Sequence, residues 1–264
     1  MMAPLPSIAA LGYHDVVADE RGASGFHRPG AWPYKLSRRA FDDHLWAIAS
    51  VTVLPTLVHE VAWGSPTKHV MLTFDDGGAS APYIGETLVR HGWRGHFFIV
   101  TSLIGTTGFA DAAGIRALRD QGHIVGSHSH SHPDIFRDLA PARMDEEWRD
   151  SRKRLSDLLG EECVVASVPG GDVSSAVLRS AADAGYAYVF TSEPDPRPAL
   201  QGHCRILGRF VVKATHTSDQ VARLARGEGW QQALLMRRLR VAATWALPGL
   251  YRQYVAFRTH PHEP

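Results

Sequence analysis

The sequence predicts an α/β protein: a distorted (β/α)7 barrel that resembles an incomplete TIM barrel and carries a helical C-terminal extension. Short apolar, β-prone runs alternate with longer amphipathic segments, which is the pattern of repeated βα units. Polar residues that could carry chemistry follow several of these runs, as they do at the C-terminal face of a barrel. We expect a barrel domain over residues 1–226 and a basic helical tail over residues 227–264.

The expected elements can be taken in chain order. The predicted strands are Ile8–Tyr13, Val70–Phe74, Gly95–Val100, Ile124–Ser127, Val164–Val168, Tyr186–Thr191 and Phe210–Lys213. The predicted helices are Arg38–Ala49, Ala81–His91, Ala112–Gln121, Pro141–Leu159, Ser175–Ala184 and Asp219–Arg226. Three of these helices are expected to begin at a capping residue whose side chain can accept a backbone N–H bond. The expected caps are Ser37 for the first helix, Asp172 or Ser174 for the fifth and Ser218 for the sixth.

The bulk composition limits the class of protein. A hydrophobic content of 44% and a charged content of 21% fit a soluble globular protein. A formal net charge of +1 gives no case for a nucleic-acid surface. Cys163 and Cys204 are far apart, which excludes a cysteine zinc cage and suits a reducing compartment. The first residues lack a signal-peptide pattern, and no apolar run could span a membrane, so a cytoplasmic location is expected.

Two segments stand apart from the βα pattern. The stretch Val17–Pro33 is rich in Gly, Ala, His and Pro and is interpreted as a long loop, either facing the substrate or disordered. The tail Gly229–His262 interleaves arginines with large apolar residues, contains no acidic residue, and is expected to break into two helices at Pro248. The two helices either pack on the barrel or a second subunit, or rest peripherally on the inner face of an anionic membrane.

Two adjacent carboxylates end the second predicted strand. The apolar run Val70–Phe74 stops abruptly at Asp75 and Asp76, which are followed by two glycines. Neighbouring carboxylates repel each other and lose solvation when buried, so a fold rarely places them at a strand end for stability alone. A metal ion is the economical positive partner for this position.

The expected partner of the carboxylates is the histidine-rich segment His128–His132. His128 and His132 are four residues apart, so both imidazoles can reach one ion from a helical turn or a bent strand end. Together with one carboxylate they form a face that leaves metal positions open for water and substrate. Such a site can lower the pKa of a bound water to about 7 and polarise a carbonyl.

These two motifs resemble those of a known family. Thr73-Phe74-Asp75-Asp76-Gly77 and the segment His128–Asp134 are similar to the first two motifs of the polysaccharide deacetylases, the NodB-homology carbohydrate esterases of family 4. The resemblance runs from about Tyr13 to about Arg209. Tyr13-His14-Asp15 is similar to a Tyr-His element in a subset that acts on exopolysaccharides. The fold implied by the family is a distorted (β/α) barrel, in agreement with the strand count.

The resemblance implies roles for individual residues. Asp76, His128 and His132 would bind one divalent metal ion, and Asp75 would act as the general base on the attacking water. We expect zinc, with nickel, cobalt, iron and manganese left open because two histidines and one aspartate select weakly among metals. The turn Pro169–Gly171 matches the third motif of the family. Its backbone N–H groups at Gly170 and Gly171 would stabilise the oxyanion, and Tyr13 would contact the substrate.

The chain also departs from the family pattern. Many members carry an arginine in the third motif that orients the catalytic aspartate, whereas Val165–Pro169 contains none. Another group must therefore orient Asp75, or the activity is weaker. The late histidine that serves as general acid has no clean counterpart, because His216 is interpreted as a surface residue. His14 is the preferred substitute, and a buried histidine bonded to the backbone is the alternative.

Three hypotheses about function follow. The first is metal-dependent removal of the N-acetyl group from an amino sugar in a polysaccharide or a lipid-linked glycan precursor, in exopolysaccharide biosynthesis. The second is an iron oxygenase that uses the same two histidines and one carboxylate, although the neighbouring Asp75 then has no function. The third is a degenerate glycan-binding module that keeps the metal and has lost catalysis, a hypothesis motivated by the missing arginine.

Overall fold

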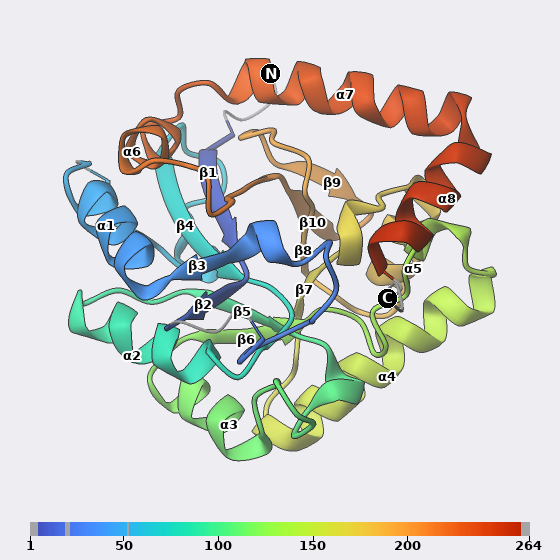
Figure 1. The fold of residues 1–264 in the computed structure, drawn as a ribbon, viewed down its shortest axis with the longest axis horizontal. Coiled ribbons are helices and arrows are strands. Elements are labelled where there is room, and N and C mark those ends of the chain that lie inside the picture. Colours follow the sequence, from blue (N-terminus) through green and yellow to red (C-terminus); the bar gives the residue numbers. More distant parts are fainter. Residues whose placement is uncertain (1–4, 19–21, 52, 260–264) are drawn as a thin grey trace.

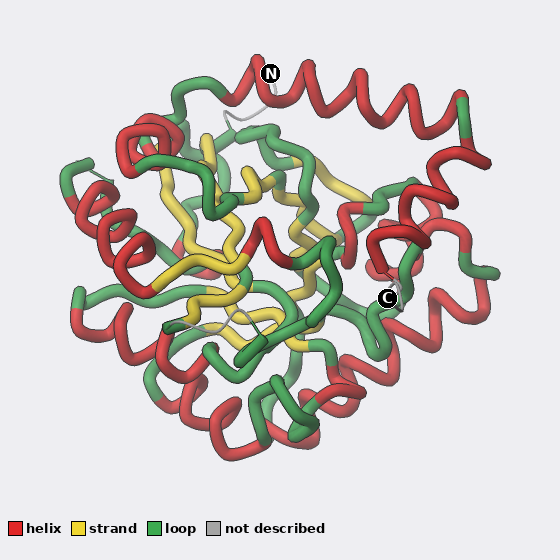
Figure 2. Tube along the Cα trace, in the orientation of Figure 1, coloured by secondary structure: helices red, strands yellow, loops and turns green. Residues whose placement is uncertain are grey.

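The computed structural model describes residues 5–18, 22–51 and 53–259. The strands are β1 (Ser7–Tyr13), β2 (Asp15–Val17), β3 (Lys35–Ser37), β4 (Lys68–Phe74), β5 (His96–Ile99), β6 (Ile124–Ser127), β7 (Val165–Ser167), β8 (Tyr188–Phe190), β9 (Ala199–Gln201), β10 (Cys204–Leu207) and β11 (Arg209–Val211). The α-helices are α1 (Arg38–Ala49), α2 (Ala81–Arg90), α3 (Ala112–Asp120), α4 (Pro141–Leu159), α5 (Ser175–Asp183), α6 (Ser218–Ala225), α7 (Trp230–Ala246) and α8 (Pro248–Thr259). Helices surround the central strands (Figures 1 and 2).

The main sheet is a distorted barrel closed by one bent segment. Its strand order is β11-β1-β4-β5-β6-β7-β8-β10-β9, and every pair is parallel except β10 with β9. β10 pairs with β8 and β11 pairs with β1, although only Gly208 separates β10 from β11. A Cβ atom at Gly208 would lie 2.3 Å from the carbonyl oxygen of Glu193, so the bend requires glycine. The predicted barrel is confirmed, and the bent β10–β11 segment completes its circuit.

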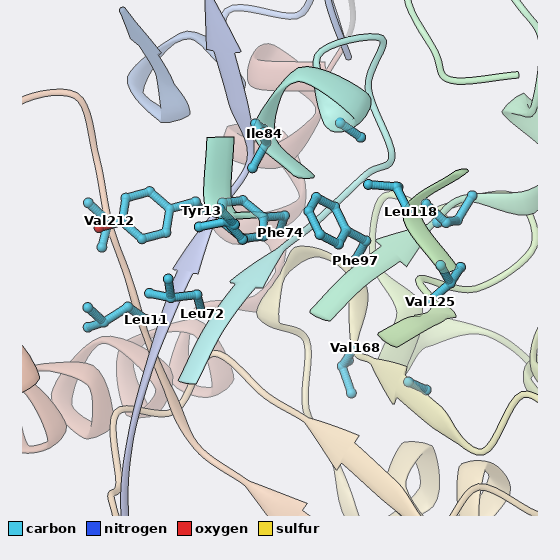
Figure 3. Close-up of a cluster of buried hydrophobic side chains, with 14 of the residues drawn as sticks. Leu11, Tyr13, Leu72, Phe74, Ile84, Phe97, Leu118, Val125, Val168 and Val212 are labelled. Atoms are coloured by element: carbon cyan, nitrogen blue, oxygen red, sulfur yellow. The ribbon is translucent and has the colours of Figure 1, made fainter. Parts of the chain in front are cut away.

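Alternation along the strands separates an inner core from an outer core. Inward-facing residues from the ring of strands form one buried cluster: Ile8, Ala10, Met71, Phe98, Val165, Phe190 and Leu207. Their neighbours along the strands face the helices, and Figure 3 shows Tyr13, Phe74 and Phe97 among them. Above the inner cluster the inward positions become polar, beginning with Thr73 and Arg209. The polar site therefore lies above the apolar core that fills the inside of the barrel.

Most local elements match the sequence predictions. All seven predicted strands and six predicted helices are present, and α1 and α4 have the predicted bounds. The Ser37 and Ser174 side chains cap α1 and α5 by accepting bonds from Ala40 N and Val177 N. The predicted cap of α6 is wrong by one residue, because Thr217 accepts the N–H bond of Gln220 and the Gln220 side chain returns one to Thr217.

The C-terminal segment forms two helices that break at Pro248, as predicted. The inner side of α7 is anchored by Trp230, which is 1% exposed and whose Nε1 donates to the carbonyl of Leu224 at 2.9 Å. On α8, the Tyr251 hydroxyl donates to Asp172 Oδ1 at 2.8 Å. The side chains of Trp245 and Arg258, and all of His262, lie outside the described residues. Among the helices of the described residues, none combines the length and the apolar content that spanning a bilayer requires. The domain division at residue 227 stays a prediction.

Candidate active site

The loop after β4 places two carboxylates at the C-terminal end of the barrel. Asp75 continues the strand register, since its N–H donates to the carbonyl of Tyr13 at 2.9 Å. Asp76 then turns the chain with φ at 73°, a left-handed conformation that is unfavourable for aspartate. The described non-glycine residues with positive φ are Asp76, Ser129 and His132, all of them in the two predicted motifs. Strain concentrated in this way is typical of functional sites.

The histidine segment is a tight turn held from α4. Glu147 on α4 is 1% exposed, and its carboxylate accepts bonds from the N–H and the hydroxyl of Ser131 at 2.7 and 2.5 Å. The Ser129 hydroxyl accepts the N–H of His132 at 3.1 Å. His130 turns away, with its Nδ1 3.0 Å from the Thr101 hydroxyl. The turn thereby presents His128 and His132 to the same side, as their four-residue spacing predicted.

Asp76, His128 and His132 converge in space. One ligand atom from each of the three residues lies within 4.8 Å of the others. Asp76 Oδ1 is 3.5 Å from His128 Nε2 and 3.7 Å from His132 Nε2. The Nδ1–H of His128 donates to the carbonyl of Ser167 at 3.1 Å, which leaves Nε2 as the free donor atom. His132 Nδ1 is buried and has no hydrogen-bond partner among the described residues.

The charges at this point fit a divalent cation. Burial lowers the pKa of His128 to about 4 and that of His132 to about 3, so both rings are neutral ligands near pH 7. Burial, together with the negative charges of Asp75 and Asp15, raises the pKa of Asp76 well above its ordinary value. An ionised Asp76 in this setting needs a positive partner. Neutral imidazoles beside a crowded carboxylate are the donor set that a metal ion such as zinc would complete.

The structure supplies an arginine for Asp75 from an unexpected strand. Arg209 at the start of β11 is fully buried, and its guanidinium donates to both Asp75 oxygens, at 2.7 and 2.8 Å. The same group donates to Thr73 Oγ1 at 3.1 Å, Ser167 Oγ at 2.6 Å and the Thr191 carbonyl at 3.1 Å. The expectation that another group must orient Asp75 is met by Arg209.

Arg209 also determines the charge state of Asp75. Burial is the largest single influence on the pKa of Asp75 and acts to raise it. The charge and hydrogen bonds of Arg209, with smaller contributions from His128 and His14, together hold that pKa well below its ordinary value. The bidentate geometry fixes the carboxylate plane as well as its charge. Asp75 Oδ2 remains 4.0 Å from His128 Nε2, beside the three converging ligand atoms. Asp75 is therefore an oriented, ionised carboxylate next to the three residues that could hold a metal ion.

The site contains two residues that were not predicted, Arg209 and Glu147, although the sequence around Arg209 carries a signal. It stands alone in the apolar run from Ile206 to Val212, where a buried charge demands a buried partner. Glu147 carries no such signal in the sequence. The helix α4 is rich in polar residues, so its sequence does not distinguish a buried glutamate from an exposed one.

His14 lines the same pocket as the two aspartates. Its ring stacks on Tyr34 with the centroids 4.7 Å apart, and its buried Nδ1 has no hydrogen-bond partner among the described residues. Burial lowers the pKa of His14, while the negative charges of Asp75 and Asp15 act against that shift. His216 is half-buried rather than a surface histidine, since it also lines the pocket and its Nδ1 accepts the N–H of Lys213 at 2.8 Å.

Tyr13 does not take the position that the sequence suggested. Its ring is fully buried, stacks on Phe74 at 5.7 Å between centroids and packs edge-on against Phe41 at 5.8 Å. Figure 3 shows Tyr13 among the apolar side chains beside Phe74. Successive residues of an extended chain face opposite sides, so the next residue, His14, lines the pocket instead. The predicted substrate contact of Tyr13 is therefore corrected to a core role. Gly170 and Gly171, by contrast, line the pocket with positive φ angles of 61° and 71°.

The pocket has a volume of about 550 Å³ and walls from distant segments. On one side Phe26 lies 4.9 Å from the His132 ring, and Arg28 pairs with Asp134 at 2.7 Å. The described part of the Val17–Pro33 loop thus contributes to the pocket wall, and its contact with a substrate stays a prediction. On the other side Arg237 of α7 donates to Glu193 at 2.8 Å and to the Gly171 carbonyl at 2.6 Å. The C-terminal helices therefore form part of the site.

Comparisons with known proteins agree with this architecture. A family model described as polysaccharide deacetylase matches residues 64–189. The putative polysaccharide deacetylase YxkH of Bacillus subtilis is 25% identical over 136 residues, 51% of this chain and 48% of the relative. The peptidoglycan-N-acetylglucosamine deacetylase PgdA of Listeria monocytogenes is 37% identical over 81 residues, 30% of this chain and 16% of the relative. The chain thus spans about half or less of these curated relatives.

A solved structure extends the likeness to the whole barrel. The structure of IcaB from Ammonifex degensii has a TM-score of 0.67 and 22% identity, and the match covers 83% of this chain and 97% of that one. At this identity the likeness concerns the fold. The similarity to the Tyr-His subset stays a prediction. The chain resembles the polysaccharide deacetylases in sequence over residues 64–189 and in fold over most of its length, which confirms the family resemblance predicted from its aspartate and histidine motifs.

Proposed function

We propose that this protein is a metal-dependent N-deacetylase that hydrolyses the acetamido group of an amino sugar in a polysaccharide or a lipid-linked glycan precursor. The observation that carries the proposal is the convergence of Asp76, His128 and His132 beside Asp75, which Arg209 holds ionised. The three convergent residues suit a cation, and the fourth suits proton transfer from water.

The residues of the chain divide the work of amide hydrolysis. Asp76, His128 and His132 would hold the metal ion, which supplies polarisation of the acetamide carbonyl and a lowered pKa for an attacking water. Asp75 accepts the proton of that water as its oxygen bonds to the carbonyl carbon. Gly170 and Gly171 offer N–H groups for the negative charge that develops on the carbonyl oxygen. When the C–N bond breaks, His14 in its protonated form gives the leaving nitrogen its proton.

Zinc is the metal that we propose. Two neutral imidazoles and one carboxylate with open positions form a common catalytic zinc site. The same donor set also accepts nickel, cobalt, iron or manganese, so the ligands alone select weakly. Metal content measured on purified protein, together with reconstitution by each ion, tests this part of the proposal.

The Arg209–Asp75 pair supports catalysis over binding without turnover. A module that only binds glycan gains nothing from a buried, bidentate carboxylate beside the metal ligands. The pair also argues against an iron oxygenase, which has no use for an ionised acid there. For the biological setting we propose biosynthesis at the cytoplasmic side, before the glycan is exported.

The direct experiment measures acetate release from a panel of N-acetylated glycans and lipid-linked sugars. We expect at least one substrate to release stoichiometric acetate, and a chelator to abolish the release until zinc is restored. Saturable sugar binding without acetate release at any metal loading would overturn the proposal. Oxygen uptake measured in the same samples tests the oxygenase alternative.

A further inference from the structure

The outer side of α7 and α8 carries large apolar side chains that the barrel does not cover. Leu235 and Leu239 on α7 are each 58% exposed, and Leu250 on α8 is 62% exposed. Leu235 and Leu239 are four residues apart and therefore lie on one face of the helix. Figure 1 shows α7 along one edge of the molecule and α8 turning back toward the barrel. We call the three exposed leucines, Leu235 and Leu239 on α7 and Leu250 on α8, the leucine stripe.

The leucine stripe is exposed even though both helices are firmly packed against the barrel. Other sides of the same helices are held by a buried tryptophan, Trp230, by the Arg237–Glu193 ion pair and by the Tyr251–Asp172 hydrogen bond. These contacts fix the rotation of both helices, so the leucines face outward while the helices are docked. An exposed apolar row on an anchored helix indicates a binding surface.

Arginines border the stripe, and acidic residues are absent from its sequence. Arg238 and Arg240 are exposed and directly flank Leu239, so each lies about 100° around the helix from it, on opposite sides. Residues 229–262 contain five arginines and no Asp or Glu. An apolar centre with cationic borders is the pattern of a helix that lies in a membrane interface, where long arginine side chains reach the lipid phosphates.

We propose that α7 and α8 dock this protein on an anionic lipid bilayer, with the leucine stripe inserted at the level of the headgroups. A second copy of the chain suits the surface less well, since a two-fold contact would bring like charges together. Met236, Arg240 and Tyr254 line the pocket from the same two helices, so docking places the pocket mouth at the membrane surface. Given the proposed deacetylase function, the substrate is a glycan anchored in that membrane.

Vesicle flotation tests the docking without any assay of activity. The full chain is mixed with vesicles of phosphatidylcholine alone or with added phosphatidylglycerol. We expect it to float with the anionic vesicles and to be released by high salt. Because each interfacial arginine contributes about fivefold in affinity, the Arg238→Gln/Arg240→Gln variant should bind about 25-fold more weakly. The Leu235→Gln/Leu239→Gln variant should lose about tenfold or more.

Matched controls use exposed residues of α1. Trp46 is 68% exposed and the Arg39 side chain 94%, so Trp46→Gln and Arg39→Gln should float like the unmodified protein. Melting curves show whether each variant is folded. If one variant does not fold, the salt dependence of vesicle binding by the unmodified protein still tests the proposal. Leu235→Gln/Leu239→Gln should keep full acetate release from a water-soluble substrate.

The proposal is overturned if the unmodified protein floats with neither vesicle. It is also overturned if the protein is a dimer that the leucine substitutions dissociate while vesicle binding is absent. If the protein floats as expected but releases no acetate, the membrane-docking proposal stands and only the proposed deacetylase reaction is refuted.

Discussion

Replacing Arg209 should damage the protein in two separable ways. In Arg209→Gln, the buried Asp75, which is 5% exposed in the unmodified protein, loses the charge that neutralises it. Breaking one partner out of a buried ion pair costs about 3–5 kcal/mol of unfolding free energy. At about 2–4 °C per kcal/mol for a chain of this size, the melting temperature should fall by roughly 6–20 °C.

The second effect concerns the acidity of Asp75. Without the guanidinium, burial dominates and the pKa of Asp75 rises. A general base must be ionised, so the acidic limb of the kcat/KM profile should move to higher pH in Arg209→Gln. In Arg209→Lys the positive charge remains but the two-pronged geometry is lost. Since hydrogen bonds to charged groups contribute about 1.5–3 kcal/mol, kcat/KM should then fall by about 10- to 150-fold with a smaller pH shift.

The assay is acetate release over a pH range, paired with thermal unfolding of the same variants. Arg205→Lys is a suitable control, because Arg205 lies on the neighbouring β10 and stacks over Trp63 away from the pocket. An Arg209→Gln protein with the unmodified melting temperature and an unmoved acidic limb would refute the assigned role of Arg209.

Three further predictions concern other parts of the site. Glu147→Gln should loosen the histidine turn and weaken metal affinity about 10- to 100-fold in a zinc titration, whereas the exposed neighbour Glu146→Gln should leave it unchanged. His14→Asn should lower kcat/KM by about 10²–10⁴-fold and remove the basic limb of its pH profile. His216→Asn should lower kcat/KM by less. Equal losses of kcat/KM in the two variants would contradict the assignment of His14 as the general acid. The pKa values of His128 and His132 are lowered to about 4 and 3, so between about pH 6.5 and 4 these two residues bind more protons in the unfolded chain than in the folded one, whereas Asp76, whose pKa is raised, acts in the opposite direction with one proton. Stability of the metal-free protein should therefore fall as the pH is lowered through that range, and a flat melting temperature there would contradict the buried, neutral state of the rings.

Local sequence rules predicted the parts of the site that are local. Asp75 and Asp76 are adjacent, and His128 and His132 are one turn apart, so their spacing shows that each pair can act together. The prediction that these distant pairs meet followed from the rule that parallel strands end at one face. The helix bounds of α1 and α4 were equally readable, because apolar periodicity and an N-terminal serine or proline mark them.

Two features could not be predicted from the sequence: how the barrel closes, and which face of a strand buried on both sides meets the pocket. Arg209 reaches Asp75 across 134 residues only because the chain bends at Gly208 and β11 pairs with β1. Tyr13 was misplaced because both faces of β1 are apolar, so the sequence does not say which face meets the helices and which meets the pocket. Both failures concern tertiary geometry that no local pattern encodes.

The central claim is that Asp76, His128 and His132 hold a cation beside a separate base, Asp75. The most direct test is zinc titration calorimetry of Asp75→Asn and Asp76→Asn, with acetate release measured on the same samples. We predict that Asp75→Asn binds one equivalent of zinc and releases no acetate, while Asp76→Asn loses both properties. Acetate release at the unmodified rate from Asp75→Asn, or undiminished zinc binding by Asp76→Asn, would contradict the account.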